Sequence, residues 1–357
     1  MIKVLIVDDS AVVRKVMTEE LSRYDDIEIV GTAVDPYIAR DKIIELQPDV
    51  ITLDLEMPRM DGLSFLAKLM KHYPMPVVVL SSLTPKNSEL AIKALDLGAV
   101  EVLCKPGAAY STKNISHSLV LAIRSASIAN VSNHCGPARP PAEKAELSNL
   151  LVKTTHKVIA IGASTGGTKA IESVLGSMPA TSPGIVIVQH MPEHFTTSFA
   201  KRLNAICPVQ VREACNNDHV VPGVALIAPG NQHMILTRVG GTYMVRIKSG
   251  PRVHYQRPSV DVLFQSVAKS AASNAIGVML TGMGADGAKG MLAMKESGAF
   301  TLAQDEATCV VYGMPKEAVK LGAVDEIVAL PQIPQSIISF LERNGKPRQA
   351  SQKGGSQ

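Results

Sequence analysis

Short runs of valine, isoleucine and leucine alternate with amphipathic stretches along most of this 357-residue chain, and this alternation limits its fold more than any other feature. Apolar runs of about five residues are typical of buried strands, and the stretches between them have helical spacing. The pattern predicts repeated βα units on parallel sheets. In the first half we expect strands at residues 2–7, 27–33, 49–53, 76–80 and 101–104, with helices between and after them.

The alternation fails from Ser125 to about Thr155, where alanine, serine, asparagine and proline accumulate. Such a stretch is typical of a linker between domains. We therefore expect one domain at residues 1–124, a flexible linker at 125–155, a second domain at 156–345 and a disordered tail at 346–357. His134 and Cys135 lie in the linker, and without nearby partner ligands they do not predict a metal site.

In the second half the strand-like runs are 157–161, 184–189, 209–213, 224–228, 232–237, 242–248, 275–280 and 299–303. Helical patterns occupy 168–178, 195–206, 259–273, 286–297, 315–321 and 333–342. The turn from Val239 to Thr242 contains two glycines and predicts a hairpin. We expect this hairpin to give the sheet an antiparallel edge.

Composition limits the classes of function and the cellular compartment that this chain fits. The five cysteines are scattered, which is typical of a reduced compartment, and no apolar run approaches the roughly 18 residues of a membrane span. We expect a cytoplasmic protein without membrane insertion. Residues 1–124 hold 14 basic and 17 acidic side chains, against 22 and 15 in the remainder. This weak asymmetry, with no tryptophan and 4% aromatic residues, argues against nucleic-acid binding.

Acidic side chains follow two strands of the first half. Asp8 and Asp9 end the first strand, and Asp54 ends the third. Because carboxyl ends of parallel strands meet at one edge, these acids can converge on a hard cation such as magnesium. Ser81 and Lys105 end the fourth and fifth strands and complete a phosphoryl site. Taken singly, the acids could instead be helix caps or loop residues, and Lys105 a surface lysine.

The first half resembles a response-regulator receiver domain of (βα)5, flavodoxin-like fold. The resemblance rests on Val7-Asp-Asp-Ser10, Asp54-x-x-Met-Pro58, Asp61-Gly62, Ser81 and Lys105-Pro106. It implies that a histidine kinase phosphorylates Asp54 and that Ser81 and Lys105 contact the phosphoryl group. It also implies a magnesium site formed by Asp8, Asp9, Asp54 and the main-chain carbonyl of Glu56. Val102 stands where many receivers carry an aromatic switch residue, so the Ser81 switch would act through a differently packed surface.

A serine lies at the end of the first strand of the second half. Gly162-Ala-Ser164-Thr-Gly166 has the Gly-x-Ser-x-Gly spacing of a nucleophile elbow, in which a sharp turn exposes the serine oxygen. The same residues also suit an ordinary helix start or an anion-binding turn.

Two further strand ends supply partners for that serine. His190 follows the strand at 184–189, and Asp286 follows the strand at 275–280. A histidine can take the serine's proton, and a carboxylate can hold the histidine in the required tautomer. The glycine-rich turn from Thr281 to Gly284 can direct main-chain N–H groups at an oxyanion. Alternatively, His190 is solvated and Asp286 caps the following helix.

Two other hydrolase classes fit parts of this pattern. His190-Met-Pro-Glu-His194 has the inverted zinc-peptidase spacing, but Pro192 belongs at a helix start, which would leave His190 before the helix and His194 inside it. The α/β-hydrolase fold shares the serine motif, but its chain order is serine, acid, histidine. The order Ser164, His190, Asp286 argues for a different fold.

The second half resembles the catalytic domain of the chemotaxis protein-glutamate methylesterases. The matching motifs are Gly162-Ala-Ser164-Thr-Gly-Gly167, Gln189-His190-Met-Pro192, Ala228-Pro-Gly230 and Leu280-Thr-Gly-Met-Gly-Ala-Asp286-Gly287. The resemblance implies a doubly wound, mostly parallel sheet with an antiparallel hairpin. It implies Ser164 as nucleophile, His190 as base and Asp286 as orienting acid, with Thr165 and the main chain of Met283 near the oxyanion.

The same resemblance implies the reaction and its partners. The substrates would be methylated glutamates, and specific glutamines, of methyl-accepting chemotaxis receptors, and the esterase step would need no cofactor. The two-domain layout suggests that the unphosphorylated receiver covers Ser164 and that phosphorylation at Asp54 opens the site. A phosphate- or nucleotide-binding module without catalysis is the alternative, with the Gly166-Gly167 and Gly282–Gly287 loops as anion sites.

Overall fold

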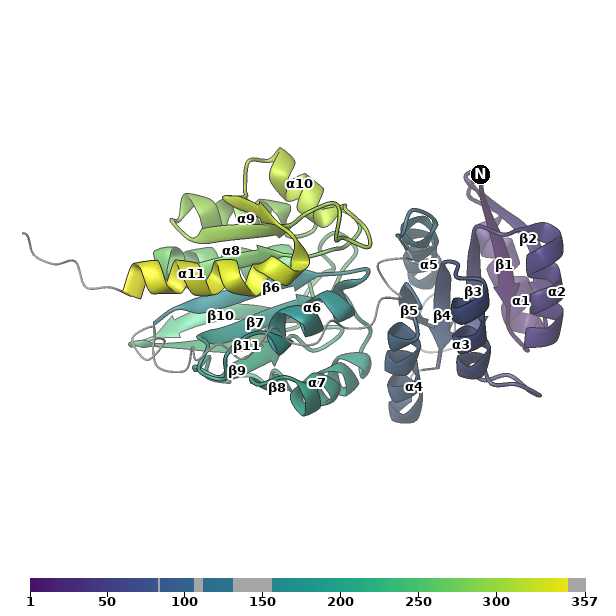
Figure 1. The fold of residues 1–357 in the computed structure, drawn as a ribbon, viewed down its shortest axis with the longest axis horizontal. Helices are drawn as coiled ribbons and strands as arrows, with labels where there is room; N and C mark the ends of the chain where they lie inside the picture. The colour runs from purple at the N-terminus through teal and green to yellow at the C-terminus, as the bar shows by residue number, and fades with distance from the viewer. Residues whose placement is uncertain (83, 106–111, 131–155, 346–357) are drawn as a thin grey trace, which may run out of the picture.

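The computed structural model describes residues 1–82, 84–105, 112–130 and 156–345, which form two α/β units side by side (Figure 1). The first unit has a parallel sheet of strand order β2-β1-β3-β4-β5. Strands β3 and β4 are buried along their whole length, because helices cover both faces of the sheet. Its elements are β1 (Ile2–Val7), α1 (Ala11–Leu21), β2 (Ile27–Ala33), α2 (Pro36–Leu46), β3 (Val50–Asp54), α3 (Gly62–His72), β4 (Val77–Ser81), α4 (Pro85–Asp96), β5 (Glu101–Cys104) and α5 (Thr112–Ser127).

The second unit has a larger parallel sheet of strand order β14-β13-β12-β6-β7-β9-β8. The central strands β6, β7 and β12 are buried at every residue. Its elements are β6 (Val158–Ala163), α6 (Gly167–Gly176), β7 (Gly184–Gln189), α7 (Phe195–Ile206), β8 (Gln210–Glu213), β9 (Val224–Ile227), β10 (His233–Val239), β11 (Thr242–Lys248), α8 (Val260–Ala271), β12 (Ala275–Met279), α9 (Ala288–Glu296), β13 (Phe300–Gln304), α10 (Met314–Lys320), β14 (Glu326–Val328) and α11 (Ile333–Gly345).

The predicted hairpin is present, but its expected place in the sheet is wrong. Strands β10 and β11 pair antiparallel around Gly240 and Gly241 and form a separate two-stranded sheet. Strand β10 packs on α8, where the Ser266 hydroxyl accepts a 2.8 Å hydrogen bond from the main-chain N–H of Leu236. The main sheet therefore stays parallel within the described residues. Strand β14, only three residues long, was not predicted.

The expected domain limits stay predictions, although parts of them can be compared with the helices. Helix α5 runs to Ser127, three residues past the predicted end of the first domain. Helix α11 ends at Gly345, where the second domain is expected to end. Most of the predicted linker, including His134 and Cys135, and the whole predicted tail lie outside the described residues.

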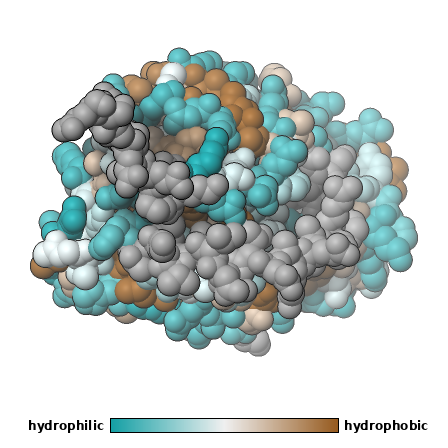
Figure 2. Space-filling model, turned by 60° about the vertical axis from the view of Figure 1, so that its left-hand side comes forward, coloured by the Kyte–Doolittle hydropathy of each residue, from teal (hydrophilic) through white to brown (hydrophobic). Residues whose placement is uncertain are grey.

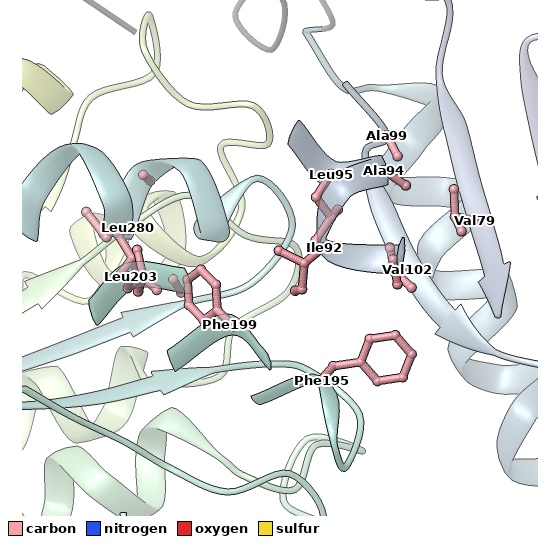
Figure 3. Close-up of a cluster of buried hydrophobic side chains, with 14 of the residues drawn as sticks. Val79, Ile92, Ala94, Leu95, Ala99, Val102, Phe195, Phe199, Leu203 and Leu280 are labelled. Carbon is pink, nitrogen blue, oxygen red and sulfur yellow. The ribbon is translucent and has the colours of Figure 1, made fainter. Parts of the chain in front are cut away.

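The two units meet through α4 and β5 of the first and α7 of the second (Figure 1). One cluster of buried apolar side chains extends across the boundary. In Figure 3, Phe195 of α7 points toward Val102 of β5, near Ile92 and Leu95 of α4. At the edge of this cluster the Arg202 guanidinium pairs with two carboxylates, Asp96 of α4 at 2.9 Å and Glu172 of α6 at 2.8 Å.

Among the described residues, no helix has the length and apolar character needed to cross a membrane. Hydrophilic side chains cover much of the coloured part of the face shown in Figure 2, with a smaller group of hydrophobic ones beside them.

Candidate active site

The carboxyl edge of the larger sheet brings the three predicted catalytic side chains to one region. The chain passes from β6 to β7 on one side and later returns to β12 on the other, so the strand order reverses next to β6. Sites in open α/β sheets form at such a reversal. Ser164 follows β6, His190 follows β7 and Asp286 lies beyond β12. His190 Nε2 lies 2.8 Å from Asp286 Oδ2.

Ser164 lies in the turn between β6 and α6, as the elbow spacing predicted. Gly166 closes this turn with a φ of +77°, a conformation that favours glycine. Three hydrogen bonds fix the Ser164 main chain. Its N–H donates to the Thr281 carbonyl at 3.0 Å, and its carbonyl accepts from Gln189 Nε2 at 2.9 Å and from the Gly167 N–H at 2.7 Å. The serine is 7% exposed.

His190 is held by Asp286 on one nitrogen and has the other nitrogen available. Its Nδ1 is buried and makes no hydrogen bond within the described part of the chain, and thus none to Ser164. Because Nε2 faces the carboxylate, Nδ1 is the atom that can accept a proton. Catalytic hydrogen bonds are commonly unformed in structures without substrate.

Asp286 does not cap its own helix, which was the alternative interpretation of this residue. Gly287 is the N-cap of α9 and provides no side-chain bond. The Asp286 carboxylate instead accepts hydrogen bonds from three donors at the start of α8: the Ser259 hydroxyl and the N–H groups of Val260 and Asp261, at 2.8, 2.7 and 3.1 Å. Burial alone would raise the pKa of Asp286, but His190 and these donors lower it below its ordinary value.

The turn after β12 lies beside the serine, with main-chain donors available. The Thr281 hydroxyl donates to the carbonyl of Thr165 at 3.0 Å and so joins this turn to the serine turn. The N–H groups of Met283 and Thr165 have no main-chain acceptor among the residues described. The Thr165 hydroxyl donates to Glu101 of β5 at 2.8 Å, across the boundary between the units.

The position of His194 argues against the zinc-peptidase interpretation. His194 was expected inside the helix, but it is the N-cap of α7, with a φ of +70° and an exposed side chain. His190 is bound to Asp286. In the described ranges, clusters of potential metal ligands are Asp8, Asp9 and Asp54, and His254, Asp261 and Asp286. Neither contains both histidines of the motif.

The cavities beside His190 are small because the first unit lies over them. One, of about 130 Å³, is lined by β5 residues, His190, Glu193, Arg252 and other side chains. Another, of about 20 Å³, reaches Ser164 and is lined by Val102 and Phe195. A helix about 10 Å in diameter cannot enter either cavity.

The first unit brings its predicted acidic residues together as well. Ligand oxygens of Asp8, Asp9 and Asp54 lie within 4.8 Å of one another. Lys105 Nζ lies 3.0 Å from Asp8 Oδ2 and 2.6 Å from Asp54 Oδ2. Burial raises the pKa of Asp54 to about 6, although Lys105 opposes this. Ser81 is buried at the end of β4, and its hydroxyl donates to the Asn87 carbonyl at 3.4 Å. This carboxylate set suits the oxygen-ligand preference of magnesium.

Comparisons with known proteins agree with both halves of this description. Residues 159–337 match the CheB methylesterase family, and residues 4–114 match the response regulator receiver domain. The chain belongs to the CheB methylesterase family. Proteins named protein-glutamate methylesterase/protein-glutamine glutaminase are 61% identical in Syntrophus aciditrophicus and 52% identical in Salmonella choleraesuis; the alignments cover 95% of this chain and 99% and 96% of those relatives.

A solved structure gives the same assignment. The Thermotoga maritima CheB methylesterase catalytic domain matches 52% of this chain and 99% of its own length, at 37% identity and a TM-score of 0.51. The predicted family, fold class and hydrolase class are confirmed, so a binding module without catalysis is set aside. The confirmed fold class also excludes the α/β-hydrolase fold.

Several residues of the CheB site escaped sequence reasoning. Glu101 belongs to the receiver domain, and no local pattern links it to Thr165. Gln189 supports the serine turn from the end of β7; it stands in one of the matching motifs, but the sequence pattern assigned it no role. Ser259 is different, because a serine directly after Pro258 and before an apolar run is a helix-start signal. The helix predicted at 259–273 begins at this residue, but the pattern did not indicate the contact of Ser259 with Asp286.

Proposed function

We propose that this chain hydrolyses glutamyl methyl esters of chemoreceptors through an acyl-enzyme formed on Ser164. His190 takes the serine proton at Nδ1, and Ser164 Oγ bonds to the γ-carbonyl carbon. The bond to the methoxy oxygen then breaks, and methanol leaves with the proton from His190. Water, deprotonated by the same histidine, releases the glutamate and restores the serine. A receptor glutamine would follow the same steps with ammonia leaving, as the relatives' glutaminase names indicate.

The buried pair of His190 and Asp286 carries this proposal. Asp286 is ionised at neutral pH because its pKa is lowered, and its hydrogen bond to Nε2 leaves Nδ1 free to act as the base. The N–H groups of Met283 and Thr165 are suitable donors to the oxyanion of the tetrahedral intermediate. One such donor typically contributes about 3–4 kcal/mol to the transition state.

In the receiver domain, we propose that Asp54 accepts a phosphoryl group from a chemotaxis histidine kinase in the cytoplasm. Asp8, Asp9, Asp54 and the Glu56 carbonyl would hold magnesium, which offsets negative charge on the phosphoryl oxygens. Lys105, already within 2.6 Å of Asp54, and Ser81 would contact those oxygens.

We also propose that the unphosphorylated receiver inhibits the esterase by covering its mouth. The small cavities at His190 and the hydrogen bond from Thr165 to Glu101 support this, since a receptor helix has no access in this arrangement. Phosphorylation at Asp54 would shift the population toward an open arrangement.

The decisive test measures methanol released from a methylated receptor by the full chain, with and without a small-molecule phosphodonor. Ser164→Ala should abolish release while Asp54 is still phosphorylated. Asp54→Asn should keep the basal release and lose the stimulation. Release by Ser164→Ala would exclude the acyl-enzyme, and equal rates with and without phosphorylation of Asp54 would exclude control by the receiver.

A further inference from the structure

At the N-termini of α8 and α9, a carboxylate beside each helix accepts hydrogen bonds from N–H groups of the other helix. Asp286, which precedes α9, accepts the N–H groups of Val260 and Asp261 at the start of α8. In return Asp261 Oδ1 accepts the N–H of Gly290 in the first turn of α9, at 2.7 Å. A side chain at Gly290 would place Cβ 2.7 Å from Phe264 Cβ, so glycine permits this close approach. The position of Asp286 therefore depends on Asp261.

A second histidine lies behind this pair. His254 Nε2 lies 3.0 Å from Asp261 Oδ2, and the ligand atoms of His254, Asp261 and Asp286 all lie within 4.8 Å of one another. His254 is held on a tight turn, in which the main chains of Val253 and Gln256 exchange two hydrogen bonds of 3.0 and 2.8 Å. The side chains thus form a row in which each carboxylate faces one histidine: His190, Asp286, Asp261 and His254.

The two carboxylates interact electrostatically because both are buried. Asp261 is 3% exposed and Asp286 is 2% exposed. Burial raises the pKa of Asp261 and the charge of Asp286 raises it further, while the Gly290 N–H and His254 act in the opposite direction. The groups that face Asp261 are therefore Asp286 and His254. Those that face His190 are Asp286 and, from the receiver, Glu101; the cavity that His190 lines also holds Cys104, Glu193, Arg252 and Arg257.

We propose that Asp261, held by His254, is a positioning residue for the catalytic Asp286 and sets the electrostatic potential at His190. This inference rests on the proposed acyl-enzyme function. A negative charge on Asp261 favours the imidazolium that forms when Ser164 loses its proton. The contact of His254 Nε2 with Asp261 Oδ2, at 3.0 Å, draws part of that charge away from Asp286. The second pair thus adjusts the basicity of His190 without touching substrate.

The test is the pH dependence of kcat/KM for methanol release from methylated receptor by the full chain in excess of a small-molecule phosphodonor, which keeps closure by the receiver out of the pH profile. Its acid limb reports protonation of the essential base in the free enzyme. Asp261→Asn keeps an oxygen for the Gly290 N–H but removes the charge, so the limb should move to lower pH by roughly half a unit or more. His254→Gln removes the imidazole that faces Asp261, so more of the Asp261 charge acts on His190 and the limb should move to higher pH. The His254 side chain is 39% exposed, so this substitution removes little buried packing.

Asp325→Asn is the matched control. Asp325 also accepts a main-chain N–H, from Thr301 at 2.9 Å, and pairs with a base, Lys295, at 3.2 Å. It lies at the amino ends of β13 and β14, the opposite edge of the sheet from Ser164. This variant should leave the acid limb in place.

Opposite displacements in the Asp261 and His254 variants would support the inference. A lower rate with an unmoved limb in both would show a purely structural role and overturn it, and so would displacements in the same direction. If the Asp261 variant does not fold, the direction of the His254 shift decides alone. Failure of the proposed function is distinguishable, because methanol release would then survive Ser164→Ala in the otherwise unchanged chain.

Discussion

The carboxylate of Glu101 accepts a 2.8 Å hydrogen bond from the hydroxyl of Thr165, which places a receiver side chain against the residue that follows Ser164. Glu101 lies at the start of β5, in the receiver. This polar contact between the domains thus lies beside the proposed nucleophile, so separating the domains also changes the surroundings of Ser164.

Glu101→Gln should lower the basal rate of the unphosphorylated enzyme. Burial raises the pKa of Glu101 in the closed arrangement, so closure is accompanied by proton uptake at this residue. Closure is therefore favoured as the pH falls, and it weakens as the pH rises through the raised pKa. Glutamine is neutral throughout and keeps an oxygen for Thr165. Methanol release without phosphodonor, measured between about pH 6 and about pH 8.5, should be several-fold lower in the variant at the alkaline end. A higher rate there would contradict this account of closure.

Asp96→Asn should raise the basal rate, because it breaks the ion pair between Arg202 and the receiver. Partly exposed pairs of this kind contribute roughly 0.2–1 kcal/mol, which corresponds to an increase of up to about fivefold. Glu172→Gln is the matched control, since it removes the partner of Arg202 within the catalytic domain and leaves the contact with Asp96. Equal increases in both variants would assign the effect to Arg202 itself rather than to the interface.

Val102→Phe should also raise the basal rate. Val102 is 7% exposed and lines the cavity of about 20 Å³ that reaches Ser164, opposite Phe195. A phenyl ring does not fit there, and such overpacking typically costs about 1–3 kcal/mol. The same substitution at Val12, which is 72% exposed on α1, should change nothing. Phosphorylation of Asp54, measured in parallel, must persist, or the receiver rather than the interface has been damaged.

Asp286→Asn should reduce both activity and stability. The amide would present N–H groups where Asp286 now accepts from Val260, Asp261 and the Ser259 hydroxyl, so about 1–3 kcal/mol of stability should be lost at neutral pH. Because the pKa of Asp286 is lowered, its contribution is present above the unfolded-state pKa of about 3.9 and disappears as the pH falls through the folded value. Urea unfolding of both proteins at neutral and acid pH checks this, and a pH-independent difference would contradict it.

The parts of the structure that depend on local pattern could be predicted from the sequence. Ser164, His190 and Asp286 each follow a fully buried apolar strand, and the rule that parallel strands share a carboxyl edge is enough to bring them together. Their chain order also excluded the α/β-hydrolase fold. The acids of the receiver, Asp8 and Asp54, follow from the same rule.

The parts that depend on packing between distant elements could not be predicted. Asp286 precedes α9 and has the pattern of its N-cap, but the approach of α8 at Gly290 makes Asp286 a cap for the other helix. His194 was placed inside α7 because Pro192 signals a helix start, yet the helix begins only at Phe195. The contact of Glu101 with Thr165 joins separate domains, and no spacing in the chain encodes it.

The apolar cluster that includes Val102 and Phe195 is continuous from one domain into the other. Opening the enzyme therefore brings apolar surface into water, and that exposure carries a positive change in heat capacity. Under the proposed control by the receiver, the balance between the resting and active arrangements should therefore depend on temperature as well as on phosphorylation, and the same receiver should hold the esterase closed to different extents in a cold cell and a warm one.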